Sequence, residues 1–259
     1  MFIDSHCHLD RLDLSKHNDS LTELLNDARQ RGVSKMLCVG IDMNLYPAML
    51  EAIEGQSDVY ASVGIHPCHV EESPWNEAQI RQAVAANQRV VALGETGLDF
   101  FYKTDTRDQQ VESFANHLKL GSELDLPVII HTREAREETL EVMQDHADPD
   151  TAGVMHCFTE TMEMAMRSIE LGFMISFSGI ITFKNAADLR EVVKAVPLDK
   201  FLIETDSPYL APVPYRGKTN QPGYVAEVAQ CVADLKGIRV EEVAERSAAN
   251  FHRLFKKAA

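Results

Sequence analysis

Two histidines separated by one residue, His6 and His8, follow the first apolar segment of the chain. On an extended strand, residues i and i+2 point to the same face and their Cα atoms lie roughly 6.5 Å apart. Both imidazoles can therefore reach one cation at a bond length of ~2.0–2.1 Å. Cys7 lies between them and points the other way, so we expect it in the core. A lone pair of this kind also occurs on ordinary strand edges, so the metal prediction depends on further ligands.

Further side chains that bind metals occur at the ends of later apolar segments. They are His66, Glu95, His131, His156 and Asp206. Histidines and carboxylates without a usable cysteine suit Zn, Mn, Fe, Ni or Co, and also Mg when water completes its coordination. Four of these histidines, His6, His8, His131 and His156, together with the two carboxylates exceed what one tetrahedral ion needs. Two ions ~3.5–4 Å apart that share Glu95 would use all six. Such a pair could activate water and hold a phosphoryl or carbonyl oxygen.

Short apolar segments alternate with longer helix-like segments along the whole chain. The expected strands are 2–5, 34–39, 59–63, 90–93, 127–130, 153–155, 173–177 and 200–203. The expected helices are 20–31, 43–55, 75–87, 106–124, 134–146, 160–171, 185–195 and 222–236, with a further one at 240–257. Eight such alternations predict βαβ units and a parallel sheet.

A closed (β/α)8 barrel of the TIM type fits 259 residues as a single domain, 1–259, better than an open doubly wound sheet does. No G-x-G-x-x-G sequence follows the first strand, which disfavours a dinucleotide-binding sheet. Reactive groups in such a barrel collect at the carboxyl ends of the strands, where the histidines and carboxylates above also occur. We therefore expect them to meet at one mouth of the barrel.

The composition limits the class of partner. Lys and Arg total 25 against 40 Asp and Glu, which gives a net charge of −15 and argues against a passive polyanion binder. An enzyme that holds a few phosphates through metal ions is still compatible with this charge. The five scattered cysteines include no Cys-x-x-Cys pair, and no apolar run is long enough to span a membrane. These features predict a cytoplasmic protein with reduced thiols and no membrane association.

Longer motifs around the candidate ligands resemble those of the TatD-type metal-dependent hydrolases, within them the YcfH-like branch. The matching stretches are 4–10 (DSHCHLD), 94–99 (GETGLD), 127–133 (PVIIHTR), 156–158 (HCF), 202–210 (LIETDSPYL) and the loop 211–222. Many relatives in the wider superfamily use a modified lysine as the bridging ligand. Here the corresponding strand leads to Glu95, and the nearest lysine, Lys103, lies further along the loop.

The resemblance implies a hydrolase with two divalent ions (Mg, Mn or Zn), most often a deoxyribonuclease of the 3′–5′ exonuclease type. It implies that His6 and His8 bind one ion together with Glu95 and Asp206. His131 and His156 would bind the other ion, with Glu95 as the bridge. Asp206 would orient or deprotonate the attacking water, which requires hydrogen-bond reach to that water.

The resemblance also suggests substrate contacts. His66 would contact a phosphate, and Arg133 and Arg216 would clamp one, since a guanidinium fork suits phosphate oxygens. Other roles are open for the two arginines, because Arg133 could pair with Glu134 or Glu137 and Arg216 could be solvated. Asp99 could orient a ligand or form a turn. We expect Phe100, Phe101, Phe158 and Phe183 to pack rather than to stack on bases, and His117 to be a packing or surface residue.

The sequence is compatible with three functions. The first is a dinuclear phosphodiesterase that acts on single-stranded or frayed DNA ends as a weakly bound substrate. The second hydrolyses a carboxyl ester or amide, as an aminoacyl-tRNA deacylase or a small-molecule amidohydrolase would. The third is a scaffold with a structural metal, against which the many hydrophilic ligands argue, because structural zinc sites are closed and four-coordinate. No obligate protein partner is indicated.

Overall fold

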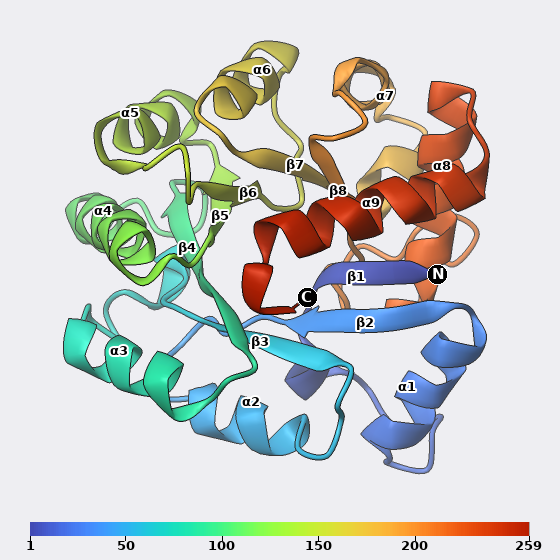
Figure 1. Ribbon diagram of the computed structural model, residues 1–259, viewed down its shortest axis with the longest axis horizontal. Coiled ribbons are helices and arrows are strands. Elements are labelled where there is room, and N and C mark those ends of the chain that lie inside the picture. The colour runs from blue at the N-terminus through green and yellow to red at the C-terminus, as the bar shows by residue number, and fades with distance from the viewer. Residues whose placement is uncertain (259) are drawn as a thin grey trace.

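The computed structural model describes residues 1–258 of the chain. In that range eight strands form one sheet, in which each strand pairs in parallel with the next in sequence order (Figure 1). The strands are β1 (Phe2–Cys7), β2 (Val33–Cys38), β3 (Val59–Val63), β4 (Val90–Asp99), β5 (Val128–Arg133), β6 (Gly153–Met155), β7 (Met174–Phe177) and β8 (Phe201–Ile203).

Contacts between β1 and the segment after β8 close the sheet. Cys7 and Ser207 form a parallel bridge. The amide of His8 donates to the carbonyl of Ser207 at 2.8 Å, and the amide of Asp206 donates to the carbonyl of His6 at 2.9 Å. These bonds complete a TIM-type barrel, which confirms the predicted fold class. They also place the first and last predicted ligand segments side by side.

Three strands are longer than the apolar pattern predicts. β1 continues to Cys7, β4 continues to Asp99 and β5 continues to Arg133. In the extensions, polar residues pair across the ladder, for example Asp99 with Arg133. Strand pairing uses backbone groups, so it can continue past the point where the side chains become polar. Consequently His6, Glu95 and His131 lie on strands of the barrel and not on loops.

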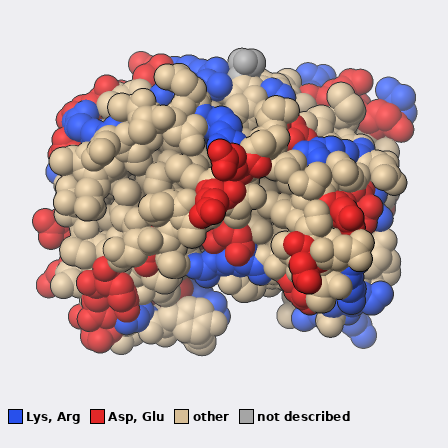
Figure 2. Space-filling model, turned by 90° about the horizontal axis from the view of Figure 1, so that it is seen from below, with Lys and Arg blue, Asp and Glu red and all other residues tan. Residues whose placement is uncertain are grey.

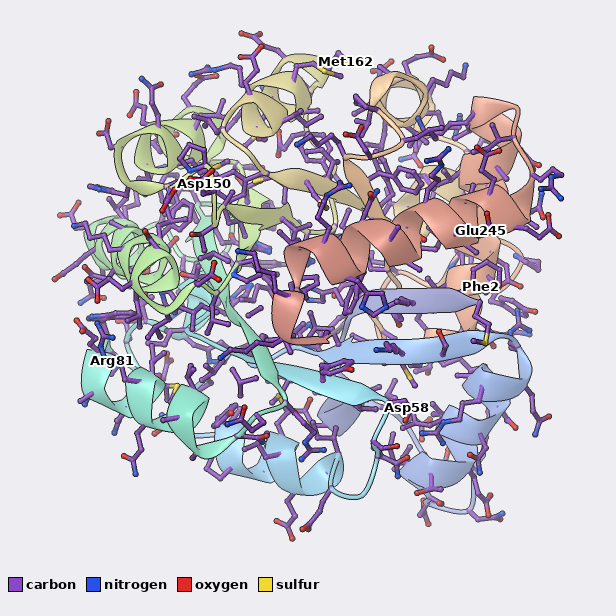
Figure 3. The ribbon with its side chains drawn as sticks, in the orientation of Figure 1. Phe2, Asp58, Arg81, Asp150, Met162 and Glu245 are labelled. Atoms are coloured by element: carbon purple, nitrogen blue, oxygen red, sulfur yellow. The ribbon has the colours of Figure 1, made fainter. Side chains whose placement is uncertain are left out.

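Helices surround the barrel and follow the predicted alternation. They are α1 (Leu21–Gln30), α2 (Tyr46–Ala52), α3 (Glu77–Ala86), α4 (Arg107–Leu124), α5 (Arg136–His146), α6 (Met162–Glu170), α7 (Ala187–Ala195), α8 (Val225–Lys236) and α9 (Val240–Leu254). The side chains of Ser20, Asn76 and Thr161 cap the starts of α1, α3 and α6. Helix side chains such as Arg81 and Glu245 point to the outside of the molecule (Figure 3). Among residues 1–258 we find no helix long and apolar enough to cross a bilayer.

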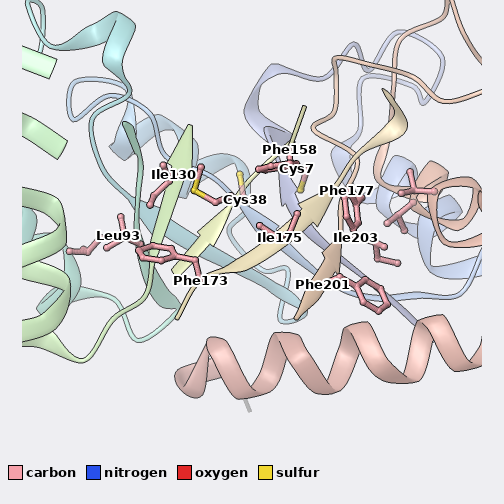
Figure 4. Close-up of a cluster of buried hydrophobic side chains, with 14 of the residues drawn as sticks. Cys7, Cys38, Leu93, Ile130, Phe158, Phe173, Ile175, Phe177, Phe201 and Ile203 are labelled. Carbon is pink, nitrogen blue, oxygen red and sulfur yellow. The ribbon is translucent and has the colours of Figure 1, made fainter. Parts of the chain in front are cut away.

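Buried apolar side chains fill the space between strands and helices. Cys7, Phe177 and Phe201 belong to the larger cluster of such residues (Figure 4). A second cluster packs strand residues such as Ile3 against Phe251 of α9. Helix α9 lies beside β1 (Figure 1), and its Asn250 donates to the carbonyl of Leu198, which precedes β8, and to that of Phe201, which begins it. The amino end of the barrel is thereby covered, which leaves the carboxyl end for a site.

Close backbone packing around β4 depends on glycine. A Cβ atom on Gly64 would lie 2.4 Å from the Cα of Gly94, so β3 and β4 can approach only because Gly64 has no side chain. A Cβ atom on Gly97, whose φ is +132°, would lie 2.0 Å from the carbonyl oxygen of His131. These contacts hold Glu95 close to both neighbouring strands.

Candidate metal centre

A cavity of ≈ 670 Å³ opens at the carboxyl end of the barrel. The predicted site residues that line it are His8, His66, Glu95, His131, Arg133, His156 and Asp206. His6 lies beside them and is fully buried. The residues come from the ends of β1, β3, β4, β5, β6 and β8, or directly follow them. Side chains far apart in the sequence therefore meet at one mouth of the barrel, as the strand-end pattern predicts.

Glu95 is the central residue, with 2% of its surface exposed. Its Oε2 atom faces β1, 3.4 Å from Nε2 of His6 and 3.9 Å from Nε2 of His8. Its Oε1 atom faces the other way, 3.2 Å from Nδ1 of His131 and 2.8 Å from Nε2 of His156. The two oxygens of one carboxylate thus face two different pairs of histidines.

The spacing of the donor atoms around His6 and His8 fits a bound cation. Two ligand atoms bound tetrahedrally at about 2.1 Å are roughly 3.4 Å apart. The Nε2 atoms of His6 and His8 are 3.4 Å apart, and Oδ1 of Asp206 lies 3.5 Å from Nε2 of His8 and 3.8 Å from that of His6. Together with Glu95 Oε2, these atoms form a convergent donor set whose chemistry suits a divalent ion.

Hydrogen bonds at the outer ring nitrogens orient two histidines of the centre, His8 and His131. Nδ1 of His8 lies 3.2 Å from the carbonyl of Val39, which can only accept a hydrogen bond. Nε2 of His131 lies 3.1 Å from Oδ2 of Asp99. In both rings the outer nitrogen is a donor, so the nitrogen facing the centre has a free lone pair when the ring is neutral. This arrangement is typical of histidines that bind metals.

His66 has the opposite arrangement. Its Nδ1 accepts a hydrogen bond from the backbone amide of Cys68 at 3.1 Å, so a neutral ring carries its proton on Nε2. Nε2 lies 3.4 Å from Oε1 of Glu95 and faces the cavity. Burial lowers the pKa of His66 to about 4, which makes this ring neutral near pH 7. The inner atom of His66 is therefore a hydrogen-bond donor that faces Glu95, whereas the inner atoms of neutral His8 and His131 are acceptors.

The carboxylates make the centre favourable for positive charge. Burial alone would raise the pKa of Glu95, but the nearby His156 and His66 bring it well below its usual range. Burial likewise opposes the ionised form of Asp206, yet the hydrogen bond with His8 lowers its pKa. The pKa of His156 is raised well above its usual value, because Glu95 and Glu204 outweigh the cost of burial. Glu95 and Asp206 are thus anionic and attract a cation.

Comparison with known proteins agrees with this geometry. The profile of the family described as TatD related DNase matches residues 3–256. The chain belongs to the TatD family.

Several TatD proteins are similar over nearly the whole chain. The uncharacterized metal-dependent hydrolase YcfH of Escherichia coli K12 is 47% identical over 253 residues, which cover 98% of this chain and 95% of YcfH. YabD of Bacillus subtilis, also an uncharacterized metal-dependent hydrolase, is 37% identical over 99% of both chains. The crystal structure of the TatD homologue YjjV from E. coli K12 superposes with a TM-score of 0.89 at 31% identity and covers 98% of each chain. This chain is accordingly a metal-dependent hydrolase.

One further residue of the TatD site was not predicted from the sequence. Oε1 of Glu204 lies 3.2 Å from Nδ1 of His156 and accepts the backbone amide of Cys157 at 2.7 Å. Glu204 is 1% exposed and precedes Asp206 by two residues in the closing motif. The sequence does hold a signal for it. A histidine that binds a metal usually donates its second ring N–H to a carboxylate, and Glu204 follows β8, two strands from the β6 strand that leads to His156.

The two predicted phosphate-binding arginines occupy different places. Arg133 lines the cavity, and among residues 1–258 no carboxylate lies within ion-pair distance of it, so the predicted alternative pairing with Glu134 or Glu137 does not occur. Arg216 is exposed, lies over the ring of Phe183 at 3.7 Å and is outside the cavity lining. The structure therefore brings Arg133, and not Arg216, to the mouth. The predicted substrate role of Arg216 therefore has no contact with the cavity to support it.

Asp99 combines the two roles that the sequence left open. Its Oδ2 atom contacts His131, and its Oδ1 atom accepts the backbone amides of Phe101 at 3.0 Å and Tyr102 at 2.7 Å. It orients a site histidine and also forms a turn. Of the four phenylalanines expected to pack, Phe101 is the exception, with 49% of its surface exposed.

Proposed function

We propose that this TatD protein is a divalent-metal-dependent phosphodiesterase that removes nucleotides from single-stranded or frayed DNA ends, with the polarity of a 3′–5′ exonuclease. The observation that carries the proposal is the division of the Glu95 carboxylate between two sets of histidines. One set is His6 and His8 with Asp206, and the other is His131 and His156. A bridging carboxylate between two donor sets is what a pair of ions ~3.5–4 Å apart requires.

Bound divalent ions would polarise the phosphoryl oxygen and lower the pKa of the attacking water. The protein supplies the groups around that reaction. Asp206 is 9% exposed and lines the cavity, so its carboxylate can accept a proton from a water molecule in the mouth. Asp206 has a φ of +55°, and the amide of Tyr209 donates to its carbonyl at 2.9 Å, so the segment after β8 is held in a tight turn.

Two groups at the mouth suit an anionic substrate better than a neutral ester. His66 directs an N–H donor into the cavity, and the guanidinium of Arg133 has no carboxylate partner in the described chain. Hydrogen bonds in which one partner is charged are roughly twice as strong as neutral ones. The guanidinium of Arg133, which has no carboxylate partner in the described chain, therefore favours a phosphate oxygen over a carbonyl oxygen.

The surface charge favours weak binding to a strand end over tight binding along a duplex. The net charge is −15, and acidic and basic side chains are interspersed on the face shown in Figure 2, without a broad basic patch. Sequence-independent affinity for DNA comes from such patches and decreases as salt increases. We expect a high KM for DNA and faster hydrolysis at low salt.

The test is an assay on end-labelled single-stranded DNA with protein that has been stripped of metal and reloaded with Mg or Mn. Wild type should shorten a 5′-labelled strand stepwise and release a 3′ label at once as a mononucleotide. Asp206→Asn should lower the rate by about 10²–10⁴, the usual contribution of a general base. Label at each end in turn reports the polarity. If Asp206→Asn with its metal still bound is as active as wild type, Asp206 is not the base.

Acyl substrates form the second arm of the same experiment. Aminoacyl-tRNA and a panel of carboxyl esters and amides are incubated with the reloaded protein under the same conditions. Hydrolysis of these substrates without DNA cleavage, at verified metal content, would replace the nuclease assignment with an acyl one, since two ions polarise a carbonyl as well as a phosphoryl group.

A further inference from the structure

Exposed aromatic side chains stand at the rim of the metal centre. Tyr102 follows β4, lines the cavity and is 64% exposed. Tyr209 follows β8, also lines the cavity and is 47% exposed, with its ring 6.1 Å from that of His8. Large apolar surface beside a cavity points to a ligand that covers it.

Tyr102 belongs to a small cluster with Phe101 and Arg133. The rings of Phe101 and Tyr102 are 4.8 Å apart and meet edge to face at 82°. The guanidinium of Arg133 lies over both, 4.1 Å from the centre of the Phe101 ring and 4.5 Å from that of Tyr102. Despite these neighbours most of the Tyr102 side chain remains uncovered, so a planar group can stack on it.

The backbone holds this cluster at a set position relative to the metal centre. Asp99 accepts the amides of Phe101 and Tyr102 with one oxygen and contacts His131 with the other. The buried Gln110 accepts the amide of Asp99 at 2.9 Å and donates to the carbonyl of Lys103 at 2.7 Å. A loop tied down in this way pays little ordering entropy when a ligand binds.

We propose that Tyr102, supported by Phe101 and Arg133, forms a nucleotide subsite next to the scissile bond. The base of a nucleotide stacks on Tyr102, and the phosphate that links it to the next nucleotide pairs with Arg133. The inference rests on the proposed function, because it uses the same cavity, and it adds that the enzyme recognises an unpaired base beside the bond it cleaves. In a duplex that base is stacked and paired, so the subsite selects single-stranded ends.

The experiment compares oligonucleotides that differ in one base. A tetrahydrofuran abasic residue replaces the nucleotide on one side of the terminal phosphodiester in the first oligonucleotide and on the other side in the second. We measure kcat and KM for each of them and for the intact strand. Stacking of one base on an aromatic ring corresponds to about 5- to 150-fold in affinity. With wild type, kcat/KM should be lower by a factor in this range for one of the abasic oligonucleotides than for the intact one, mainly because KM rises. We call this factor the abasic penalty. In Tyr102→Ala that penalty should fall below about twofold.

Two further variants control the comparison. Tyr102→Trp keeps a stacking surface and should retain the penalty. Tyr215→Ala removes a ring that stacks on Tyr224 at 3.9 Å and does not line the cavity, so it should also retain the penalty. An unchanged penalty in Tyr102→Ala would overturn the subsite while leaving the nuclease assignment intact.

A binding measurement separates failure of the subsite from failure of the proposed function. A single-stranded oligonucleotide with a terminal 2-aminopurine is titrated with metal-free protein, so that no cleavage is involved. Stacking should quench its fluorescence with wild type and Tyr102→Trp but not with Tyr102→Ala. If wild type cleaves no DNA and gives no quenching, the subsite is wrong together with the function. Quenching without cleavage would support a nucleotide subsite in an enzyme with another reaction.

Discussion

Glu204 and His156 are joined by a contact of 3.2 Å between Oε1 and Nδ1, and both side chains are buried. The carboxylate fixes the ring so that its Nε2 atom faces Glu95. We expect Glu204→Gln to weaken metal binding about 10- to 100-fold, the usual effect of changing the residue that hydrogen-bonds to a metal-binding histidine. Isothermal titration with Mn or Zn measures this, and excess metal should restore activity. The exposed Glu170→Gln serves as control, and equal affinities in the two variants would contradict the role of Glu204.

Glu95 is expected to matter more than any outer partner, because its two oxygens face both histidine sets. Glu95→Gln keeps the size of the side chain but removes its charge. We expect the metal content per chain, measured by elemental analysis after dialysis, to fall. We also expect the rate of hydrolysis to fall by more than about 100-fold, the largest effect usual for a residue that only hydrogen-bonds to a metal ligand. Full metal content with normal activity would rule out a bridging role for Glu95.

Removal of metal should destabilise the fold, because the donor groups around Glu95 would be left facing one another. At a metal concentration 100 times the Kd, binding to the native state contributes about 2.7 kcal/mol. For a chain of this size that corresponds to a fall of roughly 5–10 °C in Tm on treatment with EDTA. Differential scanning fluorimetry with EDTA, and then with added Mn or Zn, tests this. The same Tm in all three conditions would count against a resident metal.

His117 provides a pH-dependent test away from the metal centre. Its Nε2 accepts the amide of Ile65 at 3.2 Å and its Nδ1 donates to the carbonyl of Ser113 at 2.7 Å, so α4 is joined to the segment that follows β3. Burial lowers the pKa of His117 from 6.5 to about 4. Between pH 6.5 and pH 4 His117 is therefore protonated in the unfolded chain but neutral in the folded chain. The contribution of His117 to the free energy of unfolding is complete above pH 6.5 and is lost as the pH falls towards 4.

A neutral amide at position 117 should remove that part of the acid sensitivity. Gln can replace both hydrogen bonds but does not titrate. Between pH 7.5 and pH 5 the free energy of unfolding of His117→Gln should fall by about 2 kcal/mol less than that of wild type. Urea denaturation at the two pH values measures the difference. Parallel losses in the two proteins would show that His117 does not remain neutral in the folded state.

The positions of the two arginines predict unequal effects on hydrolysis. Arg133 lines the cavity, so Arg133→Ala should lower kcat/KM about 10-fold or more, the cost of one charge-assisted hydrogen bond. Arg216 stacks on Phe183 away from the mouth, and Arg216→Ala should change kcat/KM by less than about twofold, as an exposed substitution does. Steady-state kinetics on the same oligonucleotide compares them. Equal losses would mean that the loop with Arg216 reaches the substrate.

The sequence alone was sufficient for the fold class and for the expectation that the candidate ligands lie close together. Apolar segments that alternate with helical ones predict a parallel barrel, and in such a barrel the strand ends must meet at one mouth. His6, Glu95 and Asp206 could therefore be assigned to one centre although they lie far apart in the chain. The strand limits were less accurate, because backbone pairing in β4 and β5 continues through polar residues that an apolar pattern excludes.

Only the tertiary structure decided which atoms face which. The division of the Glu95 oxygens, and the difference between His66 and the other histidines, depend on hydrogen bonds to groups remote in sequence or on backbone direction. In the sequence Glu204 is one acidic residue among many. Its role follows only from the fold, in which β6 and β8 bring it into contact with His156. Exposure is likewise a property of the folded chain. An aromatic residue such as Tyr102 has the same sequence signal whether it packs in a core or stands at the rim of a cavity.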